Sequence, residues 1–216
     1  MKRSLSAAVV LLCLFGMLVA AAGKRHGGKT QGGFDYYVLA LSWAPNYCAG
    51  HPNDNSAECR AGEHAGFLLH GLWPQANTGS SPVNCGGVSP ASSALVREMA
   101  NYYPSRGLVQ HEWETHGSCS GLSAVDYFAA VKQADHAIKI PDAYRNLSRD
   151  QNLSVSEIEK AFAAANHAPA SAFRISCHEA ELVNVEACLT KDLAFQACTA
   201  SARECPASQV LMRAIR

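Results

Sequence analysis

The chain has 216 residues and a formal net charge of zero, with 18 Lys or Arg against 18 Asp or Glu and the histidines neutral. This balance argues against a protein that holds nucleic acid by bulk electrostatics, because phosphate-driven affinity needs clustered Lys and Arg. Any polyanion would have to be bound locally, by a few side chains.

Residues 1–22 have the pattern of a secretory signal peptide. Lys2 and Arg3 precede an apolar run of about 13 residues, and the run ends in three alanines that suit a cleavage site. The run is shorter than the roughly 20 apolar residues of a spanning helix, and no later segment approaches that length. The protein is therefore expected to be secreted or periplasmic, with no membrane segment after cleavage.

The rest of the chain is predicted to form one compact domain. Residues 23–33 are polar, glycine-rich and without periodicity, which indicates a flexible lead-in. Residues 34–216 are long enough for a single core, and they contain neither a repeat nor a Pro-rich or Ser-rich linker. Cleavage after Ala22 would remove two of the 18 basic residues and leave a net charge of −2.

The pattern of residues along this domain predicts strands at both ends and helices between them. Helical spacing is found at Ala91–Tyr103, and capping signals at Ser123 and at Ser154 begin two further helices. Short apolar or alternating runs predict strands at Phe34–Trp43, Gly66–Trp73, Ala172–Cys177, Glu181–Leu189 and Leu193–Cys198. Strands, then helices, then strands favour an α+β domain built on an antiparallel sheet.

The cysteines predict a disulfide-stabilised domain. An even number of them remains after the signal peptide, which in a secreted chain indicates a disulfide framework. No pair has the C-x-x-C spacing of a zinc knuckle or a thioredoxin-like centre, and the sequence by itself permits 105 pairings. The eight are Cys48, Cys59, Cys85, Cys119, Cys177, Cys188, Cys198 and Cys205.

Two short segments hold the candidate catalytic residues. Phe67–Pro74 contains His70, and the segment 111–119 contains His111, Glu112 and His116. Histidine has an unperturbed pKa of about 6.5, so it can give and take protons near neutrality. Three imidazoles and a carboxylate among rigid Trp, Gly and Pro residues indicate acid–base catalysis.

The periodicity of a helix or a strand predicts which side chains of each segment share a face. On a helix, positions 111, 112, 115 and 116 share one face, and Trp113 turns away to anchor the core. Strand alternation puts His70 and Leu72 on one face, and Leu69, Gly71 and Trp73 on the other. The missing side chain of Gly71 allows another group to approach closely.

Two other chemistries compete with acid–base catalysis. A zinc protease helix needs H-E-x-x-H, whereas His111 and His116 are five residues apart and no third ligand presents itself. A nucleophilic Cys119 beside His116 is less favoured than a disulfide. No metal or cofactor is therefore expected. The six histidines outside the two segments are interpreted as surface or structural: His26, His51, His64, His136, His167 and His178.

The two segments resemble the signature segments of the ribonuclease T2 family, secreted acid endoribonucleases. His70-Gly-Leu-Trp-Pro74 and His111-Glu-Trp-x-x-His-Gly-x-Cys119 occur in the family's order and separation, and a looser likeness extends from Leu41–Cys48 to the terminal cysteines. The resemblance implies an antiparallel sheet flanked by helices. It also implies the disulfide pairs Cys48–Cys59, Cys85–Cys119, Cys177–Cys205 and Cys188–Cys198.

The chemistry implied by this resemblance is metal-independent cleavage of single-stranded RNA through a 2′,3′-cyclic phosphate, followed by slower hydrolysis to a 3′-phosphate. By similarity His116 is the general base and His70 the general acid. His111 would hold the phosphate, and Glu112 would help to stabilise the phosphorane. Trp73 matches a base-stacking residue of the family, RNA is the expected partner, and a monomer is expected.

Two departures from the family pattern bear on activity. Many members carry Lys where this chain has Thr115, so a cation that would offset the charge of the phosphorane is missing. Some members place Asp where this chain has Gln75, which favours broad base specificity. An alternative interpretation, motivated by Thr115, is a catalytically weakened relative that binds RNA or a protein partner.

Overall fold

The computed structural model describes residues 33–60, 62–199 and 204–216. The predicted signal peptide, and the predicted lead-in apart from Gly33, lie outside the described residues. Within the described ranges, no helix combines the length and the apolarity needed to cross a bilayer.

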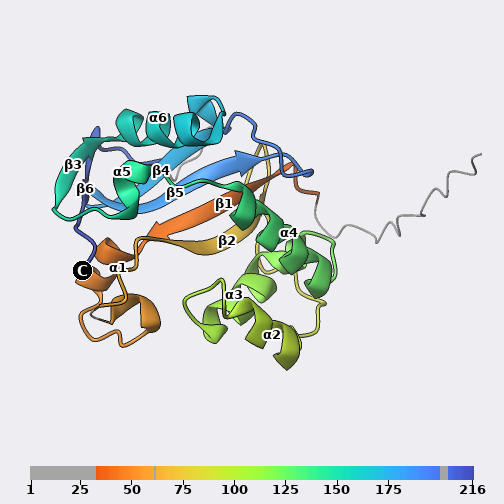
Figure 1. Ribbon diagram of the computed structural model, residues 1–216. Coiled ribbons are helices and arrows are strands. Elements are labelled where there is room, and N and C mark those ends of the chain that lie inside the picture. The colour runs from red at the N-terminus through yellow and green to blue at the C-terminus, as the bar shows by residue number, and fades with distance from the viewer. Residues whose placement is uncertain (1–32, 61, 200–203) are drawn as a thin grey trace, which may run out of the picture.

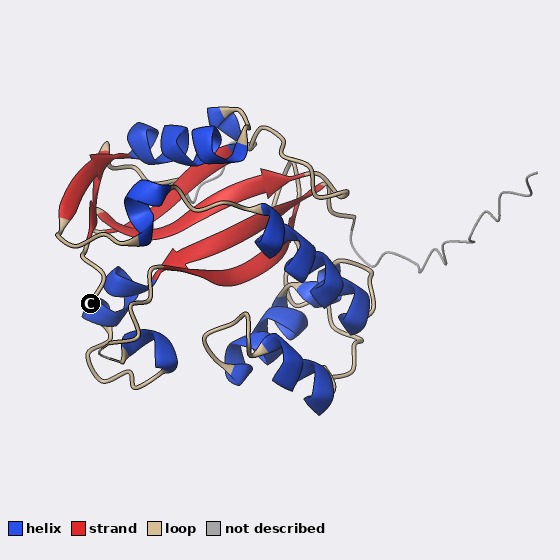
Figure 2. Ribbon diagram, in the orientation of Figure 1, coloured by secondary structure: helices blue, strands red, loops and turns tan. Residues whose placement is uncertain are grey.

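One sheet organises the domain (Figures 1 and 2). Its strands follow the order β2-β1-β5-β6-β3, and β4 pairs with β5 off this path. The pairings are antiparallel except for β5 with β6, which run parallel at the pair Glu181 and Leu211. The strands are β1 (Tyr36–Trp43), β2 (Phe67–Gln75), β3 (Gln151–Ser154), β4 (Phe173–His178), β5 (Glu181–Leu189) and β6 (Gln209–Met212).

Helices flank the sheet, and α2, α3, α4 and α6 share one main core with it. In Figure 1, α6 lies along the sheet beside β4 and β5, whereas α2, α3 and α4 gather together near β2. The helices are α1 (Ala44–Gly50), α2 (Ser93–Met99), α3 (Arg106–Thr115), α4 (Ala124–Ala137), α5 (Asp142–Arg145) and α6 (Val155–Asn166). The α+β class and the sheet flanked by helices are thereby confirmed.

The two capping signals read from the sequence begin helices as predicted. The Ser123 hydroxyl accepts the Asp126 backbone N–H ahead of α4. Ser154 and Glu157 form a full capping box ahead of α6, each side chain accepting from the other residue's backbone N–H. These bonds satisfy backbone donors that have no partner within the helix.

The strand predicted at Leu193–Cys198 is wrong. Its only ladder contact among the described residues is an isolated bridge between Leu189 and Phe195. The backbone N–H of Leu193 donates to Thr190, and Leu193 has a left-handed φ of 64°, so the chain turns back sharply after β5. The strands β3 and β6, of four residues each, were not predicted because their runs are too short to show a period.

All four implied disulfides are present, namely Cys48–Cys59, Cys85–Cys119, Cys177–Cys205 and Cys188–Cys198. Three of them tie surface segments to the sheet or to α1. The fourth, Cys85–Cys119, joins the turn that follows α3 to the long segment after β2. The fold therefore fixes the second candidate segment covalently as well as by packing.

A β-bulge at His70 overturns the predicted alternation in β2. Ala40 pairs with Gly71 and the next residue, Leu41, pairs with Leu69, so His70 is the extra residue. Leu69 and Leu72 consequently both enter the main core, three positions apart. Trp73 belongs to a smaller cluster with Ala40 and Val38 on the other face. His70 lies with Trp73, their ring centroids 5.2 Å apart.

Candidate active site

His70 is held by polar groups from two neighbouring strands. The Ser42 hydroxyl of β1 donates to Asn184 Oδ1 of β5 at 2.8 Å and lies 2.9 Å from His70 Nδ1. Since that hydroxyl gives its one proton to Asn184, it accepts from Nδ1–H of His70. The tautomer is thereby fixed, and Nε2 is left to face Glu112, with its Oε1 at 3.8 Å.

Helix α3 presents the second candidate segment as the helical face predicts. Ser105 caps its start by accepting the Leu108 backbone N–H, and His116 follows its last residue. Glu112 is fully buried, His116 is largely buried, and His111 is exposed. Trp113 anchors the other side, its indole N–H donating to the Ser89 carbonyl at 2.9 Å. The predicted role of Trp113 in the core is confirmed.

The contact that joins the two segments passes over Gly71. The Trp73 indole N–H donates to Glu112 Oε2 at 2.9 Å. A Cβ atom at position 71 would collide with Glu112 Oε2 and with the Trp73 indole nitrogen. The close approach expected of this glycine is therefore made by the carboxyl of α3.

Burial governs the protonation of the pair formed by Glu112 and His70. It raises the pKa of Glu112 from 4.5 to about 8, although the hydrogen bond from Trp73 opposes the rise. Burial also lowers the pKa of His70, against the hydrogen bond with Asn184 and together with the nearby His111. Near neutral pH the free protein thus holds a neutral carboxylic acid beside a neutral imidazole.

The imidazoles of both segments converge on one region. The Trp73 ring lies 5.2 Å from His70 and 5.2 Å from His116, and the rings of His116 and His111 are 6.5 Å apart. His70 and His111 both line a cavity of about 370 Å³ between β2 and the first turns of α3. Two imidazoles thus face a common space, with a third imidazole and a neutral acid adjoining them.

Comparison with known proteins identifies the family. The model of the ribonuclease T2 family matches residues 34–198. The chain belongs to the ribonuclease T2 family. A ribonuclease of Aeromonas hydrophila is 43% identical over 120 residues, which cover 54% of this chain and 53% of the relative. A probable ribonuclease of Haemophilus influenzae is 36% identical over 138 residues, covering 58% and 50%. The chain spans about half the length of the curated relatives it matches.

Solved structures show the same fold. An RNase-related protein from Calystegia sepium superposes with a TM-score of 0.68 at 24% identity, covering 85% of this chain and 98% of its own. A mutant of RNase MC1, a ribonuclease of bitter gourd seeds, was solved in complex with 5′-UMP. It superposes with a TM-score of 0.66 at 22% identity, covering 82% and 97%.

The three residues predicted to bind substrate occupy different surroundings in this ribonuclease T2 family member. Trp73 is only 6% exposed and orients Glu112, so its base-stacking role stays a prediction. Gln75 is buried and turned to the following loop, with its Oε1 accepting the Ser81 hydroxyl proton. The Thr115 hydroxyl lies 3.4 Å from His111 Nδ1, beside the cavity region.

Ser42 and Asn184 are functional positions that the sequence reasoning missed. Both are polar residues inside largely apolar strands, and Asn184 is buried in the run Leu182–Leu189. A buried polar residue that interrupts such a run needs a hydrogen-bond partner, and this signal could have identified them. His51 and His178, interpreted as surface or structural, line a second cavity together with His70.

Proposed function

We propose that the chain is an endoribonuclease that cleaves single-stranded RNA by metal-independent transphosphorylation. The observation that carries this proposal is the convergence of His70, His111 and His116 around a buried Glu112, beside a cavity that two of the imidazoles line. Membership of the ribonuclease T2 family supports the same reaction class.

The reaction divides proton transfer between two imidazoles. His116 removes the proton of the ribose 2′-hydroxyl, whose oxygen then attacks the adjacent phosphorus. The bond from phosphorus to the 5′-oxygen breaks, and that oxygen takes a proton from Nε2 of His70. The products are a 2′,3′-cyclic phosphate and a free 5′-hydroxyl, and slower hydrolysis converts the cyclic end to a 3′-phosphate.

The lowered pKa of His70 makes acid pH favourable for this mechanism. His70 must carry a proton on Nε2 to act as the acid, and burial disfavours that charge in the free protein. A bound phosphodiester brings a negative charge next to the imidazole and favours its protonation. Mildly acidic pH and bound substrate therefore both favour the protonated form of His70.

Glu112 contributes as a neutral acid. With a pKa of about 8 it keeps its proton at the working pH, so it can donate a hydrogen bond to a phosphoryl oxygen. An ionised carboxylate there would repel the phosphorane instead. The indole of Trp73 fixes one carboxyl oxygen, and the other oxygen faces His70. His111 is proposed to hold the phosphate from the exposed side.

Broad base specificity and action outside the cytoplasm, in the periplasm or the medium, belong to the same proposal. The Gln75 amide is turned to its own loop, which supports weak discrimination between bases. Four disulfides support folding in an oxidising compartment after removal of the signal peptide. We expect the mature protein to act as a monomer.

The decisive experiment analyses the ends left on RNA in the presence of EDTA. We expect 2′,3′-cyclic ends from the wild type, no reaction with DNA, and loss of cleavage in the His70→Ala and His116→Ala variants. His136→Ala serves as the matched control, since His136 lies on α4 away from both segments and should leave the rate unchanged. Cleavage that requires a metal, or full activity in both variants, would refute the assignment.

A further inference from the structure

A second and larger cavity adjoins His70. It has a volume of about 630 Å³ and is lined by residues of α1, the β4–β5 turn and the chain end after β6. Ser42, Tyr47 and His70 line this cavity and also the 370 Å³ cavity, so the two spaces meet at these three residues. An RNA strand that leaves the smaller cavity past His70 would enter the larger one.

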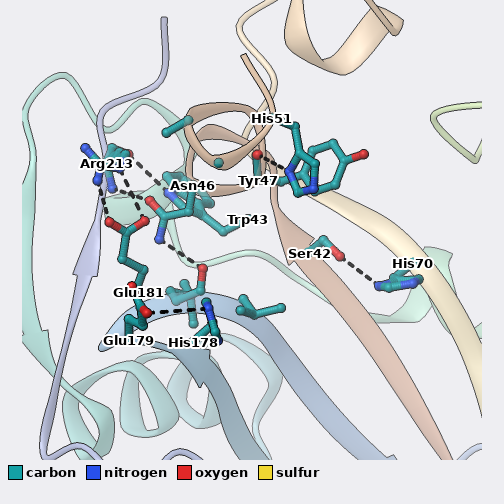
Figure 3. Close-up of a pocket in the computed structure, with 14 residues that line it drawn as sticks. Ser42, Trp43, Asn46, Tyr47, His51, His70, His178, Glu179, Glu181 and Arg213 are labelled. Atoms are coloured by element: carbon teal, nitrogen blue, oxygen red, sulfur yellow. Dashed lines mark hydrogen bonds and ion pairs between the residues drawn. The ribbon is translucent and has the colours of Figure 1, made fainter. Parts of the chain in front are cut away.

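The wall nearest to the junction is a stacked pair of rings (Figure 3). The rings of Tyr47 and His51 lie 4.2 Å apart at an interplanar angle of 22°. Tyr47 is 40% exposed, so part of its ring is accessible to a ligand. Figure 3 shows this pair facing the same space as Ser42 and His70.

The stacked pair is held rigidly. His51 Nδ1 donates to the Tyr47 carbonyl at 2.8 Å, and the Tyr47 hydroxyl donates to Asp54 at 2.9 Å. The disulfide Cys48–Cys59 closes the loop that carries both contacts. Because the rings are fixed before any ligand arrives, stacking a base on them costs little conformational entropy.

The opposite wall carries charged groups, but these already have partners within the protein. It is therefore better suited to a base than to a phosphate. Arg213 forms an ion pair with Glu181, and His178 Nε2 lies 4.0 Å from Glu179. Figure 3 shows both pairs across the cavity from the rings. With its guanidinium engaged and two carboxylates present, this wall offers a phosphate little net attraction. Stacking is therefore the interaction that the cavity can supply, and it suits any base.

We infer that the 630 Å³ cavity is a subsite for a nucleotide downstream of the scissile bond, with its base stacked on Tyr47 and His51. The inference rests on the proposed function. His70 protonates the departing 5′-oxygen, so the nucleoside that carries this oxygen lies on the His70 side, in the 370 Å³ cavity. The next nucleotide in the 3′ direction then reaches the larger cavity. His116, the proposed base, lines neither of these two cavities.

Chimeric oligonucleotides with one ribonucleotide test this subsite, because only the bond after the 2′-hydroxyl can be cleaved. The substrates are rU-dA, rU-dA-dA with one more nucleotide on the 3′ side, and dA-rU-dA with one more on the 5′ side. For the wild type we expect kcat/KM for rU-dA-dA to exceed that for rU-dA about tenfold, the size expected for one stacked base.

The variants are compared by the ratio of kcat/KM values for rU-dA-dA and rU-dA. In Tyr47→Ala this ratio should fall to about 1, whereas Tyr47→Phe should keep it because the ring remains. The ratio of dA-rU-dA to rU-dA should not change. Tyr102→Ala is a matched control, since Tyr102 pairs with His136 elsewhere and should keep both ratios. Should Tyr47→Ala not fold, His51→Ala removes the other ring and should lower the same ratio.

Three results would overturn the subsite. The first is a wild-type ratio of kcat/KM for rU-dA-dA over rU-dA that is near 1. The second is a ratio that Tyr47→Ala and His51→Ala both leave unchanged. The third is an equal fall in the ratio of dA-rU-dA over rU-dA. Each of these appears while rU-dA is still cleaved, so the proposed function survives. Failure to cleave all three substrates would instead refute the proposed function, and the subsite would be refuted with it.

Discussion

Replacing Glu112 by Gln should remove a large pH dependence from the stability of the folded protein. The Glu112 carboxyl is fully buried, with one oxygen bonded to Trp73 and the other 3.8 Å from His70 Nε2. Its pKa is about 8 in the folded state, against 4.5 for a glutamate exposed to water, as in the unfolded chain. Gln keeps a carbonyl oxygen that accepts the Trp73 N–H but cannot titrate.

The direction in which stability changes with pH follows from the number of protons bound by the folded and the unfolded protein. Between pH 4.5 and about 8 the folded protein holds a proton on Glu112 that the unfolded chain has lost. The stabilising contribution is therefore complete below pH 4.5 and is lost as the pH rises through about 8. A difference of about 3.5 between the two pKa values corresponds to at most about 5 kcal/mol, at 1.36 kcal/mol per pKa unit.

Urea unfolding at a series of pH values, followed by tryptophan fluorescence with the disulfides intact, measures this effect. The free energy of unfolding of Glu112→Gln minus that of the wild type should rise steadily from about pH 4.5 to about pH 8. Glu114→Gln, which removes an exposed carboxyl on the same helix, is the matched control. A flat difference for Glu112→Gln would mean that Glu112 is ionised in the folded protein, paired with a His70 imidazolium, and would refute the neutral pair.

Three further substitutions test the geometry of the site. Asn184→Leu removes the polar side chain that raises the pKa of His70, so the alkaline limb of kcat/KM should move to lower pH. Gly71→Ala drives a methyl group into the Glu112 carboxyl, and unfolding measurements should show a loss of about 1 to 3 kcal/mol together with reduced cleavage. Thr115→Lys adds a cation beside His111, and kcat for RNA should rise about tenfold if charge on the phosphorane limits turnover.

Two of these substitutions have a matched control. For the stability of Gly71→Ala the control is Gly107→Ala, which adds a methyl group in α3 at ordinary contact distance, 3.8 Å from the nearest atom, and should stabilise by about 0.5 to 1 kcal/mol. Thr115→Gln lengthens the side chain without charge and should give no gain in kcat. An alkaline limb that Asn184→Leu leaves in place would show that Ser42 and Asn184 do not set the protonation of His70. A tolerated Gly71→Ala would contradict the close approach of Glu112.

The helical part of the site was predictable because helix geometry is regular. The placement of positions 111, 112 and 115 in α3, and of His116 directly after it, follows from a constant 100° step. The short-range capping bonds at Ser123 and Ser154 need no tertiary information. Apolar patterning likewise predicts β1 and β5 from side-chain type. The protonation states of Glu112 and His70 could not be predicted, because burial by segments distant in sequence sets both.

The sheet part of the site could not be derived from alternation, and the reason is the bulge at His70. Regular pairing would send His70 and Trp73 to opposite faces of β2, and the Trp73 indole could then not lie beside the imidazole. The extra residue shifts the period, so His70, Gly71 and Trp73 all lie toward α3 while Leu69 and Leu72 remain in the core. Glu112 can then enter over Gly71 and bond Trp73, which brings its other oxygen to His70. One irregular pairing between β1 and β2 therefore decides whether the two segments form a single site.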